Sequence, residues 1–315
     1  MKAYAIDDFG RPGSVRELPD PEPGEGQVRI RVAAAALNPF DVTVTSGFMR
    51  DQMEHRFPLV PGSDASGTID ALGPGVTDRV IGDEVFGTSG KPFVGEGSLA
   101  ELFVVSVDTI AAKPDAVDHR TAAGIPVAGA TALTMVEAAR MAQGDVVVAL
   151  GATGGVGSFL VQLAAKRGAT VVAVASAPNA DYARSLGATD VVDYAAADDV
   201  VEEIRSRYPD GITVIADMHR NGDTVVRLAE LVGEGGRVVS AVGSADPDAL
   251  ASRGIEAANV MGRVATDPLG TLAEMLERGE LVAPDLHDYP LSGAAEALEA
   301  VGSGHTRGKI VVLPD

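Results

Sequence analysis

Four glycines follow directly after an apolar run near the middle of the chain, and this feature constrains the fold most. Residues 146–150 read Val-Val-Val-Ala-Leu, and glycines stand at 151, 154, 155 and 157. A helix over residues 146–165 would be free of charge and about long enough to span a bilayer. Each glycine, however, weakens a helix by roughly 1 kcal/mol relative to alanine, whereas a strand, a tight turn and a new helix accommodate it. The pattern therefore predicts a strand, a glycine turn and a helix start, and not a membrane segment.

The second half of the chain repeats short apolar runs with helical patterns between them. This alternation predicts βαβ units, an α/β fold with a doubly wound parallel sheet of the Rossmann type. The first helix has apolar positions at Val156, Leu160, Leu163 and Ala164, with Gly168 as its C-cap. A last apolar segment, Ile255 to Gly262, is predicted to be an edge strand open to pairing with a second copy of the chain. The predicted strands before it are Asp145–Leu150, Thr170–Ala175, Asp190–Asp193, Ile212–Asp217 and Arg237–Val242.

The spacing of the glycines indicates a dinucleotide. Gly151, Gly154 and Gly157 form a G-x-x-G-x-x-G pattern, in which glycine lets the backbone bend and lets N–H groups approach a pyrophosphate at a helix N-terminus. No Gly-Lys-Ser/Thr follows, which excludes a Walker-type phosphate loop. The strand before and the helix after the turn supply the context that this motif requires. The cofactor-binding residues predicted here are Gly151, Thr153, Gly154, Gly155, Val156 and Gly157.

The end of the second predicted strand favours NADPH over NADH. NAD sites usually place an acidic residue there for the ribose 2′-OH, but this chain reads Ala175-Ser176-Ala177-Pro178-Asn179. Ser176 and Asn179 are predicted to contact the cofactor, and the alternative that they only cap the following helix stays open. Tyr194, after the third strand, is predicted to stack near the adenine.

A 2′-phosphate normally binds a cation, and the loop supplies none. Asp181 stands where a lysine would help, and Arg184 lies one turn into the helix, where it can point away. The charge is then expected from Arg307 or Lys309, with Lys309 the predicted cofactor ligand. The expected preference for NADPH is therefore modest.

The first half of the chain has the pattern of a small β domain. Val28, Ile30 and Val32 alternate with polar residues, and proline and glycine pairs separate short apolar runs. Beyond about residue 267 the pattern predicts a helix over Thr271–Arg278 and a final strand over Lys309–Leu313.

Composition removes several classes of function. With 45 acidic against 25 basic residues the net charge is −20, which repels nucleic acid, and no basic cluster offsets it. The chain has no cysteine, which excludes disulfides, a thiolate nucleophile and thiolate-bound zinc. The first residues contain two aspartates before any apolar run, unlike a signal peptide, so a cytoplasmic protein without a membrane partner is expected.

A series of motifs follows in order along the whole chain. The motifs are Asn38-Pro39-Phe40-Asp41, Pro61-Gly62-Ser63-Asp64-Ala65-Ser66-Gly67, Gly82-Asp83-Glu84-Val85, Gly97-Ser98-Leu99-Ala100-Glu101, Ala122–Leu133, the glycine turn, Arg184-Ser185-Leu186-Gly187-Ala188 and Arg307-Gly308-Lys309-Ile310-Val311. Together they resemble the zinc-independent medium-chain dehydrogenase/reductases, the quinone oxidoreductase or zeta-crystallin-like branch. The resemblance implies a GroES-like β domain over 1–120, a Rossmann domain over 121–267 and a return to the first domain over 268–315. It also implies a homodimer, and cofactor contacts by Thr131 and Val242.

The activity implied by the resemblance is NADPH-dependent hydride transfer to a quinone or an α,β-unsaturated carbonyl, without metal. Where zinc-dependent relatives carry cysteine and His-Glu, this chain has Asn38 and Ser63-Asp64. Of its five histidines, only His219 is placed to reach the cofactor. Reduction of enoyl thioesters, or a non-catalytic NADPH-binding role of the crystallin or regulatory kind, remain alternatives.

Asn38 and Asp41 are the predicted catalytic residues. The Asn38 amide could donate to a substrate oxygen that gains negative charge. Both residues also have a structural interpretation, because Asn before Pro forms turns and Asp41 could cap the next helix. Both interpretations stay open for Asn38, and capping is favoured for Asp41. Residues 42–50 contain no tyrosine, so the proton is expected from solvent.

Overall fold

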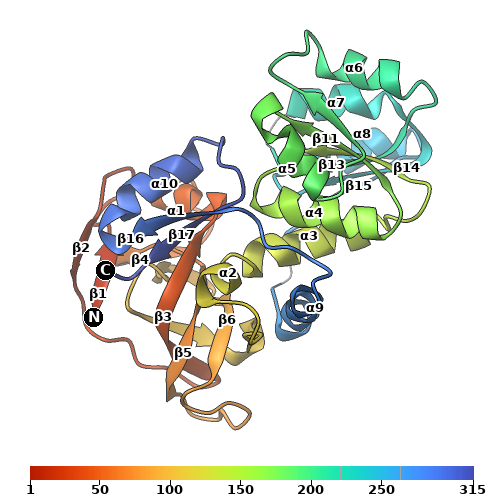
Figure 1. Ribbon diagram of the computed structural model, residues 1–315. Coiled ribbons are helices and arrows are strands. Elements are labelled where there is room, and N and C mark those ends of the chain that lie inside the picture. The colour runs from red at the N-terminus through yellow and green to blue at the C-terminus, as the bar shows by residue number, and fades with distance from the viewer. Residues whose placement is uncertain (220–221, 263) are drawn as a thin grey trace. The chain divides into compact units, whose positions relative to one another are not determined.

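The computed structural model describes residues 1–219, 222–262 and 264–315. The chain forms two compact units, each with its own sheet (Figure 1). The first unit combines Met1–Ala130 with Val264–Asp315, and the second is formed by the residues between these segments.

A seven-stranded sheet forms the framework of the first unit, counted over its described residues. Its order is β16-β17-β3-β5-β6-β9, with β8 also paired to β3. Two small sheets, β1-β2 and β4-β7, accompany it. The strands are β1 (Lys2–Ala5), β2 (Ser14–Glu17), β3 (Gln27–Leu37), β4 (Glu54–Val60), β5 (Asp64–Leu72), β6 (Glu84–Thr88), β7 (Phe93–Glu96), β8 (Leu102–Ser106), β9 (Ile110–Ala112), β16 (Leu286–Pro290) and β17 (Lys309–Leu313).

Helices pack against the strands of this sheet. Helix α2 packs on β3, β5 and β17, where Ala34, Ala36, Ala123 and Val311 form a small buried cluster. Helix α3 begins in the first unit and ends in the second. The helices are α1 (Pro39–Thr45), η1 (Val107–Thr109), α2 (His119–Ala123), α3 (Pro126–Ala138), α9 (Thr266–Glu277), η3 (Leu291–Gly293) and α10 (Ala294–Gly302).

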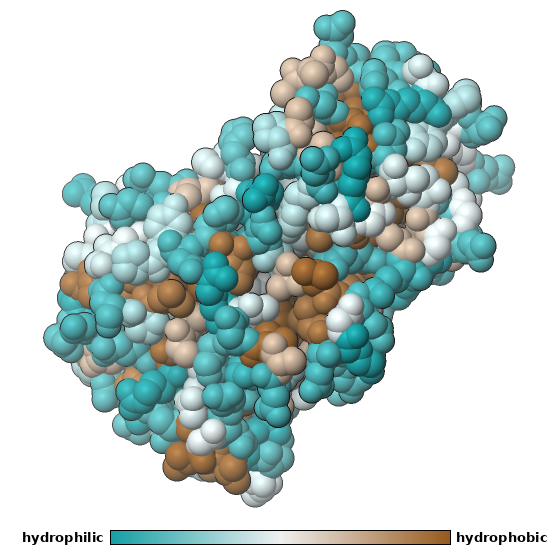
Figure 2. Space-filling model, in the orientation of Figure 1, coloured by the Kyte–Doolittle hydropathy of each residue, from teal (hydrophilic) through white to brown (hydrophobic). Residues whose placement is uncertain are grey.

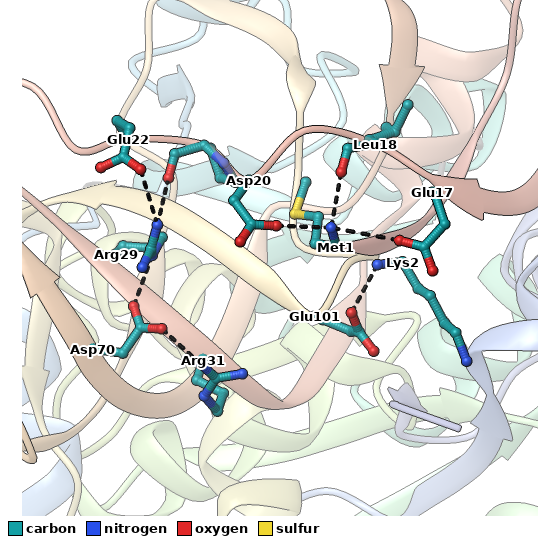
Figure 3. Close-up of polar contacts among 11 residues, drawn as sticks. Met1, Lys2, Glu17, Leu18, Asp20, Glu22, Arg29, Arg31, Asp70 and Glu101 are labelled. Carbon is teal, nitrogen blue, oxygen red and sulfur yellow. Dashed lines mark hydrogen bonds and ion pairs between the residues drawn. The ribbon is translucent and has the colours of Figure 1, made fainter.

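Strand β3 confirms the alternation predicted from sequence. Val28, Ile30 and Val32 are buried in the core, and the polar residues between them face outward. Arg29 donates to Asp70 of β5 over 2.8 Å, and Arg31 reaches the other oxygen of the same carboxylate over 3.0 Å (Figure 3). Cross-strand ion pairs thus cover the polar face of the β3-β5 pair.

The second unit confirms the predicted Rossmann topology. Over 131–219 and 222–262 its six strands are all parallel in the order β12-β11-β10-β13-β14-β15, which is the 3-2-1-4-5-6 order of doubly wound sheets. Its elements are β10 (Val146–Leu150), α4 (Gly155–Lys166), β11 (Thr170–Ala175), η2 (Ala177–Asn179), α5 (Ala180–Ser185), β12 (Asp190–Asp193), α6 (Val200–Arg207), β13 (Ile212–Asp217), α7 (Gly222–Ala229), β14 (Val232–Ser240), α8 (Pro247–Ala251) and β15 (Glu256–Asn259).

Several elements differ from the predicted bounds: β10 begins at Val146 and not at Asp145, β14 begins at Val232 and not at Arg237, and β15 spans Glu256–Asn259 and not Ile255–Gly262. Strand β14 ends at Ser240 and not at Val242, because the Ser240 hydroxyl accepts the N–H groups of Val242 and Ser244 and turns the chain away from the sheet. Helix α9 begins at Thr266, five residues before the predicted start at Thr271. Pro268 lies in its first turn, where no intrahelical N–H bond is required, so proline does not delay the helix.

The border between the units falls after Ala130, whereas the sequence pattern placed it near residue 121. From residue 121 onward the sequence has the apolar helical pattern that is typical of the second half of the chain, and the border was therefore predicted there. The first helix of that stretch nevertheless packs on the sheet of the first unit. The return to the first unit begins at Val264, close to the expected position.

The segment 146–165 forms strand β10, the glycine turn and most of helix α4, as predicted. Among the described residues, no helix combines the length and apolar character needed to span a bilayer. Figure 2 shows hydrophilic residues over much of the visible surface, with hydrophobic residues in separate groups.

Candidate functional site

The glycine turn lies at the carboxyl end of β10, in the middle of the second unit's sheet. Gly151 has φ +77°, a left-handed conformation that glycine adopts without strain. Helix α4 then begins at Gly155, and the Ser158 N–H makes the first intrahelical bond, to Gly154 O over 2.9 Å. The N–H groups of Gly155, Val156 and Gly157 precede that bond, so they point out of the helix N-terminus. Thr153 is buried within the turn.

The glycines of the turn have different physical roles. A Cβ on Gly157 would collide with the Gly151 carbonyl oxygen and with Ala152, so Gly157 allows the helix to pack closely. A Cβ on Gly154 would meet only Gly151 O, at an ordinary 3.5 Å, and the φ of Gly154 is −78°. Neither packing nor backbone conformation requires glycine at 154. Space is kept free in front of the helix N-terminus, and this arrangement fits the pyrophosphate of a dinucleotide.

Ser176 and Asn179 lie together after β11. Asn179 Nδ2 is 3.3 Å from Ser176 Oγ, and neither side chain makes a capping bond to the helices that follow. Arg184 forms an ion pair with Asp181 over 3.1 Å, so it is engaged within its own helix. Tyr194 directly follows β12 and its residue surface is 49% exposed, which leaves its ring accessible.

Polar groups also gather at the carboxyl ends of β13 and β14. Asp217 is fully buried and accepts the His219 N–H over 3.0 Å and the Ser240 hydroxyl over 2.9 Å. Through Ser240 this carboxylate fixes the turn that holds Val242. His219 is exposed and lies against the glycine turn, since a Cβ on Gly151 would be 3.3 Å from the His219 Cβ. Sequence reasoning missed Asp217 and Ser240, although each is a polar residue that ends an apolar strand.

Thr131 lies near the middle of α3 and is buried. Within the second unit it packs directly against Gly262, where a Cβ would collide with the Thr131 hydroxyl.

In the first unit, three adjacent strands bring Asn38, Asp64 and Lys309 together. Asn38 directly follows β3, Asp64 begins β5 and Lys309 begins β17, and β3 pairs with both other strands. Lys309 Nζ donates to Asn38 Oδ1 over 2.7 Å and to the Leu37 carbonyl over 2.8 Å. Asn38 Nδ2 donates to Asp64 Oδ2 over 3.0 Å, and Nζ lies 3.8 Å from the same oxygen. We call Asn38, Asp41, Asp64 and Lys309 the buried polar cluster.

Asp41 joins this cluster through the start of helix α1. One of its carboxylate oxygens accepts the Asn38 backbone N–H over 2.7 Å, and the other accepts the Ser63 hydroxyl over 2.8 Å. The first contact is the carboxylate half of a capping box, the structural role expected as the alternative for Asp41.

Burial shifts the titration of all three ionisable groups in the cluster. Removal from water raises the pKa of Asp41 to about 6, although the bonds from Asn38 and Ser63 oppose the shift. Burial likewise raises the pKa of Asp64, with the Lys309 ammonium opposing, and lowers the pKa of Lys309, with the two carboxylates opposing.

The position of Lys309 differs from the expectation that it binds the 2′-phosphate. Its residue surface is only 4% exposed, and its ammonium is directed at Leu37 and Asn38 within the first unit. Lys309 therefore belongs with the predicted catalytic Asn38. From the sequence, Asp64 was noted only because, with Ser63, it replaces the His-Glu pair of zinc-dependent relatives. The signal for both residues was a charged side chain at the first position of a strand, followed by uncharged residues.

The structure also describes the positions where zinc-dependent relatives carry metal ligands. Asn38 and Asp64 are bound to each other, and the positive charge beside them is the Lys309 ammonium. Within 1–219, 222–262 and 264–315 there is no group of three or more His, Asp or Glu side chains that could hold a metal. Metal-free activity stays a prediction.

Replacement of Asp41 by Asn is expected to change how stability depends on pH. Because the folded pKa lies near 6 and an unfolded Asp titrates near 4, the folded protein binds more protons between these values. The contribution of Asp41 to the free energy of unfolding is thus greatest below about pH 4. This contribution decreases by up to about 3 kcal/mol as the pH rises to 6. Urea unfolding at several pH values should show that Asp41→Asn lacks this decrease. As a control, Asp51→Asn, at an exposed position, should show the same decrease as the wild type. If the stability of the wild type and of Asp41→Asn changed with pH in parallel, the raised pKa of Asp41 would be contradicted.

Comparisons with known proteins bear out the predicted family. Residues 24–115 match the alcohol dehydrogenase GroES-like domain, and residues 186–312 match the family described as zinc-binding dehydrogenase. The chain is 33% identical to the chloroplastic NADPH-dependent alkenal/one oxidoreductase of Arabidopsis thaliana, over 100% of this chain and 80% of that protein. It is 28% identical to the chloroplast envelope quinone oxidoreductase homolog of the same plant, over 95% and 93% of the two chains.

Solved structures agree with this result. The quinone oxidoreductase from Coxiella burnetii superposes with a TM-score of 0.89 at 29% identity, covering 99% of each chain. The fold class expected from the sequence, a Rossmann sheet plus a GroES-like β domain, is confirmed for this chain. With its two main sheets, its glycine turn and these similarities, the chain belongs to the medium-chain dehydrogenase/reductase family of oxidoreductases.

Proposed function

We propose that the protein is an NADPH-dependent reductase of quinones or α,β-unsaturated carbonyls. The observation that carries the proposal is the free space at Gly154 in front of helix α4. This space occurs in a chain that is 33% identical to a protein named for NADPH-dependent reduction of alkenals and alkenones. The similarity to proteins named quinone oxidoreductases supports quinones as the second substrate class.

The residues of each unit have separate tasks in this reaction. In the second unit, the N–H groups of Gly155, Val156 and Gly157 would hold the cofactor diphosphate. When bound, NADPH supplies a hydride equivalent to an electron-poor carbon of the substrate. In the first unit, Asn38 is the candidate hydrogen-bond donor for the substrate oxygen that gains negative charge.

We further propose that NADPH is preferred over NADH by a modest factor. The end of β11 offers the hydroxyl of Ser176 and the amide of Asn179, and no carboxylate stands at 175–177 to repel a phosphate. Arg184 is engaged with Asp181, and Lys309 is engaged in the buried polar cluster. Neutral donors alone give a smaller gain than a charge-assisted contact, which contributes roughly 1.5–3 kcal/mol.

We expect purified protein to oxidise NADPH when it is offered a small benzoquinone or a short-chain enone. The measurement is the loss of NADPH absorbance with each substrate, with an enoyl thioester as a third one. Because Asn38, Ser63 and Asp64 replace the ligands of zinc-dependent relatives, the same rate is expected after exhaustive treatment with a chelator.

Each other outcome of this assay has a definite meaning. Turnover of the thioester alone would identify an enoyl thioester reductase. Tight NADPH binding without turnover of any substrate would identify a non-catalytic binding protein. Activity lost to the chelator and restored by zinc would contradict the metal-free reaction.

Gly154→Ser is expected to weaken NADPH binding at least tenfold with little change in stability. Serine is a favourable N-cap residue, so helix α4 still begins normally. Its side chain would, however, fill the free space and its hydroxyl would compete for the N–H groups at the helix start. Fluorescence titration with NADPH and with NADH gives both dissociation constants. Gly270→Ser, which also meets open space but lies in α9 of the first unit, is the matched control. Unchanged binding by Gly154→Ser would place the diphosphate elsewhere.

We propose that two copies pair through strand β15. This strand hydrogen-bonds to β14 on one side and is the last in the order of its sheet over the described residues. Two residues beyond it, Met261 is 90% exposed. Light scattering at micromolar concentration should give twice the chain mass of 32.2 kDa. Met261→Asp should shift the protein toward the monomer, because two added charges would face each other, whereas Val282→Asp in the first unit should not. A monomeric wild-type protein would contradict this pairing.

A further inference from the structure

The side-chain amide of Asn38 has a charged partner at each end. Its Oδ1 accepts from the Lys309 ammonium over 2.7 Å, and its Nδ2 donates to the Asp64 carboxylate over 3.0 Å. An ammonium group can only donate and an ionised carboxylate can only accept. A flipped amide would set NH2 against the ammonium and the carbonyl oxygen against the carboxylate. The two charges therefore fix one orientation of this amide.

The same contacts strengthen the amide as a donor. A cation bound to Oδ1 withdraws electron density from the amide, and hydrogen bonds in a chain polarise one another. One Nδ2 hydrogen of Asn38 is used by Asp64. Among the residues that the structure describes, no acceptor is found for the second hydrogen of Nδ2. Asn38 is 4% exposed, so little water competes for this hydrogen.

A buried ion pair is costly, and stability alone does not explain this one. Apolar residues of similar volume often replace buried ion pairs with no loss of stability. Lys309 is 4% exposed and Asp64 is 0% exposed, and both lie where the neighbouring strands are apolar. Lys113 offers a contrast within the same unit. Its buried side chain is paired with Glu84 at 3.1 Å and donates to the backbone carbonyls of Pro114 and Val117, in the loop that follows β9.

We propose that Lys309 and Asp64 are positioning residues for Asn38, which hold and polarise its amide so that the free N–H binds the substrate oxygen during reduction. The proposal rests on the proposed reductase function. Hydride adds to the electron-poor carbon, the C=C electron pair moves to the adjacent bond, and the carbonyl electron pair moves onto oxygen. The Asn38 N–H donates a hydrogen bond to that oxygen and keeps its proton, and solvent then protonates the enolate carbon. Lys309 thus acts on the reaction through Asn38, and not on the cofactor phosphate.

Three variants separate positioning from structural support. Lys309→Met removes the ammonium and keeps a long apolar chain. Asp64→Asn keeps the shape of the carboxylate without its charge. The double variant removes both charges together, so it leaves no unpaired ion from this couple and should recover stability lost by Lys309→Met. Lys113→Met is the control for loss of a buried lysine that does not contact Asn38.

The first readouts are kinetic and equilibrium constants with NADPH and an enone. We expect kcat of the double variant to stay at least tenfold below wild type although its stability returns, with an unchanged dissociation constant for NADPH. If the cluster is only structural, kcat returns together with stability, and the proposal is wrong. A weakened NADPH complex with normal kcat would instead restore Lys309 as a cofactor ligand.

The second readout does not depend on activity. The chain has four asparagines, so 15N-asparagine labelling gives four side-chain NH2 pairs, and loss of one pair in Asn38→Asp assigns it. In Lys309→Met the Asn38 protons should shift upfield and exchange faster with water, whereas Lys113→Met leaves them in place. Unchanged Asn38 signals in Lys309→Met would overturn the proposal even if no quinone or enone is turned over. Shifted signals in an inactive protein would retain the positioning and refute the reductase function.

Discussion

The pairing of strand β17 with β3 is the contact on which the first unit depends. Val311 lies opposite Ala36 and Val312 opposite Ala35, so the last strand of the chain completes a sheet that the first hundred residues began. Without β17, strand β3 would be an open edge over its second half, and the small cluster beneath α2 would lose Val311. The same register delivers Lys309 to Asn38. One backbone pairing thus sets the shape of the sheet and the electrostatics of the buried polar cluster.

The second unit obtains its candidate site in a different way. Parallel strands end at the same edge of the sheet, so the residues after β10, β13 and β14 meet there. Asp217 organises this edge, because it holds the His219 backbone and the Ser240 hydroxyl at once. The glycine turn completes this candidate site with the backbone N–H groups at the start of helix α4. The first unit's cluster is therefore held by several buried charged groups, whereas the second unit's site combines one buried carboxylate with the peptide groups of the glycine turn.

The sequence predicted well whatever depends on local pattern. The bounds of β11, β12, β13 and β17 follow from apolar runs bounded by turn residues, and the topology of the second unit follows from their alternation with helices. The carboxyl end of β14 did not follow, because the Ser240 hydroxyl that ends the strand acts through a side-chain bond that periodicity does not show. The contact between Lys309 and Asn38 was not predicted either, and the reason is related. Its partner Asn38 lies 271 positions earlier in the chain, and only the pairing of β17 with β3 connects them.

Because the first unit is built from both ends of the chain, its two parts are separated in time during synthesis. The second unit is continuous in sequence, so all its strands have been made before β17 emerges. Until then Asp64 has no ammonium beside it, and one edge of β3 has no partner strand over residues 35–37. Contacts between such distant segments form slowly, since a long loop must close first. A newly made chain therefore contains a finished nucleotide-binding fold and an unfinished first unit, and the last strand pairs with an edge of β3 that would otherwise be prone to aggregation.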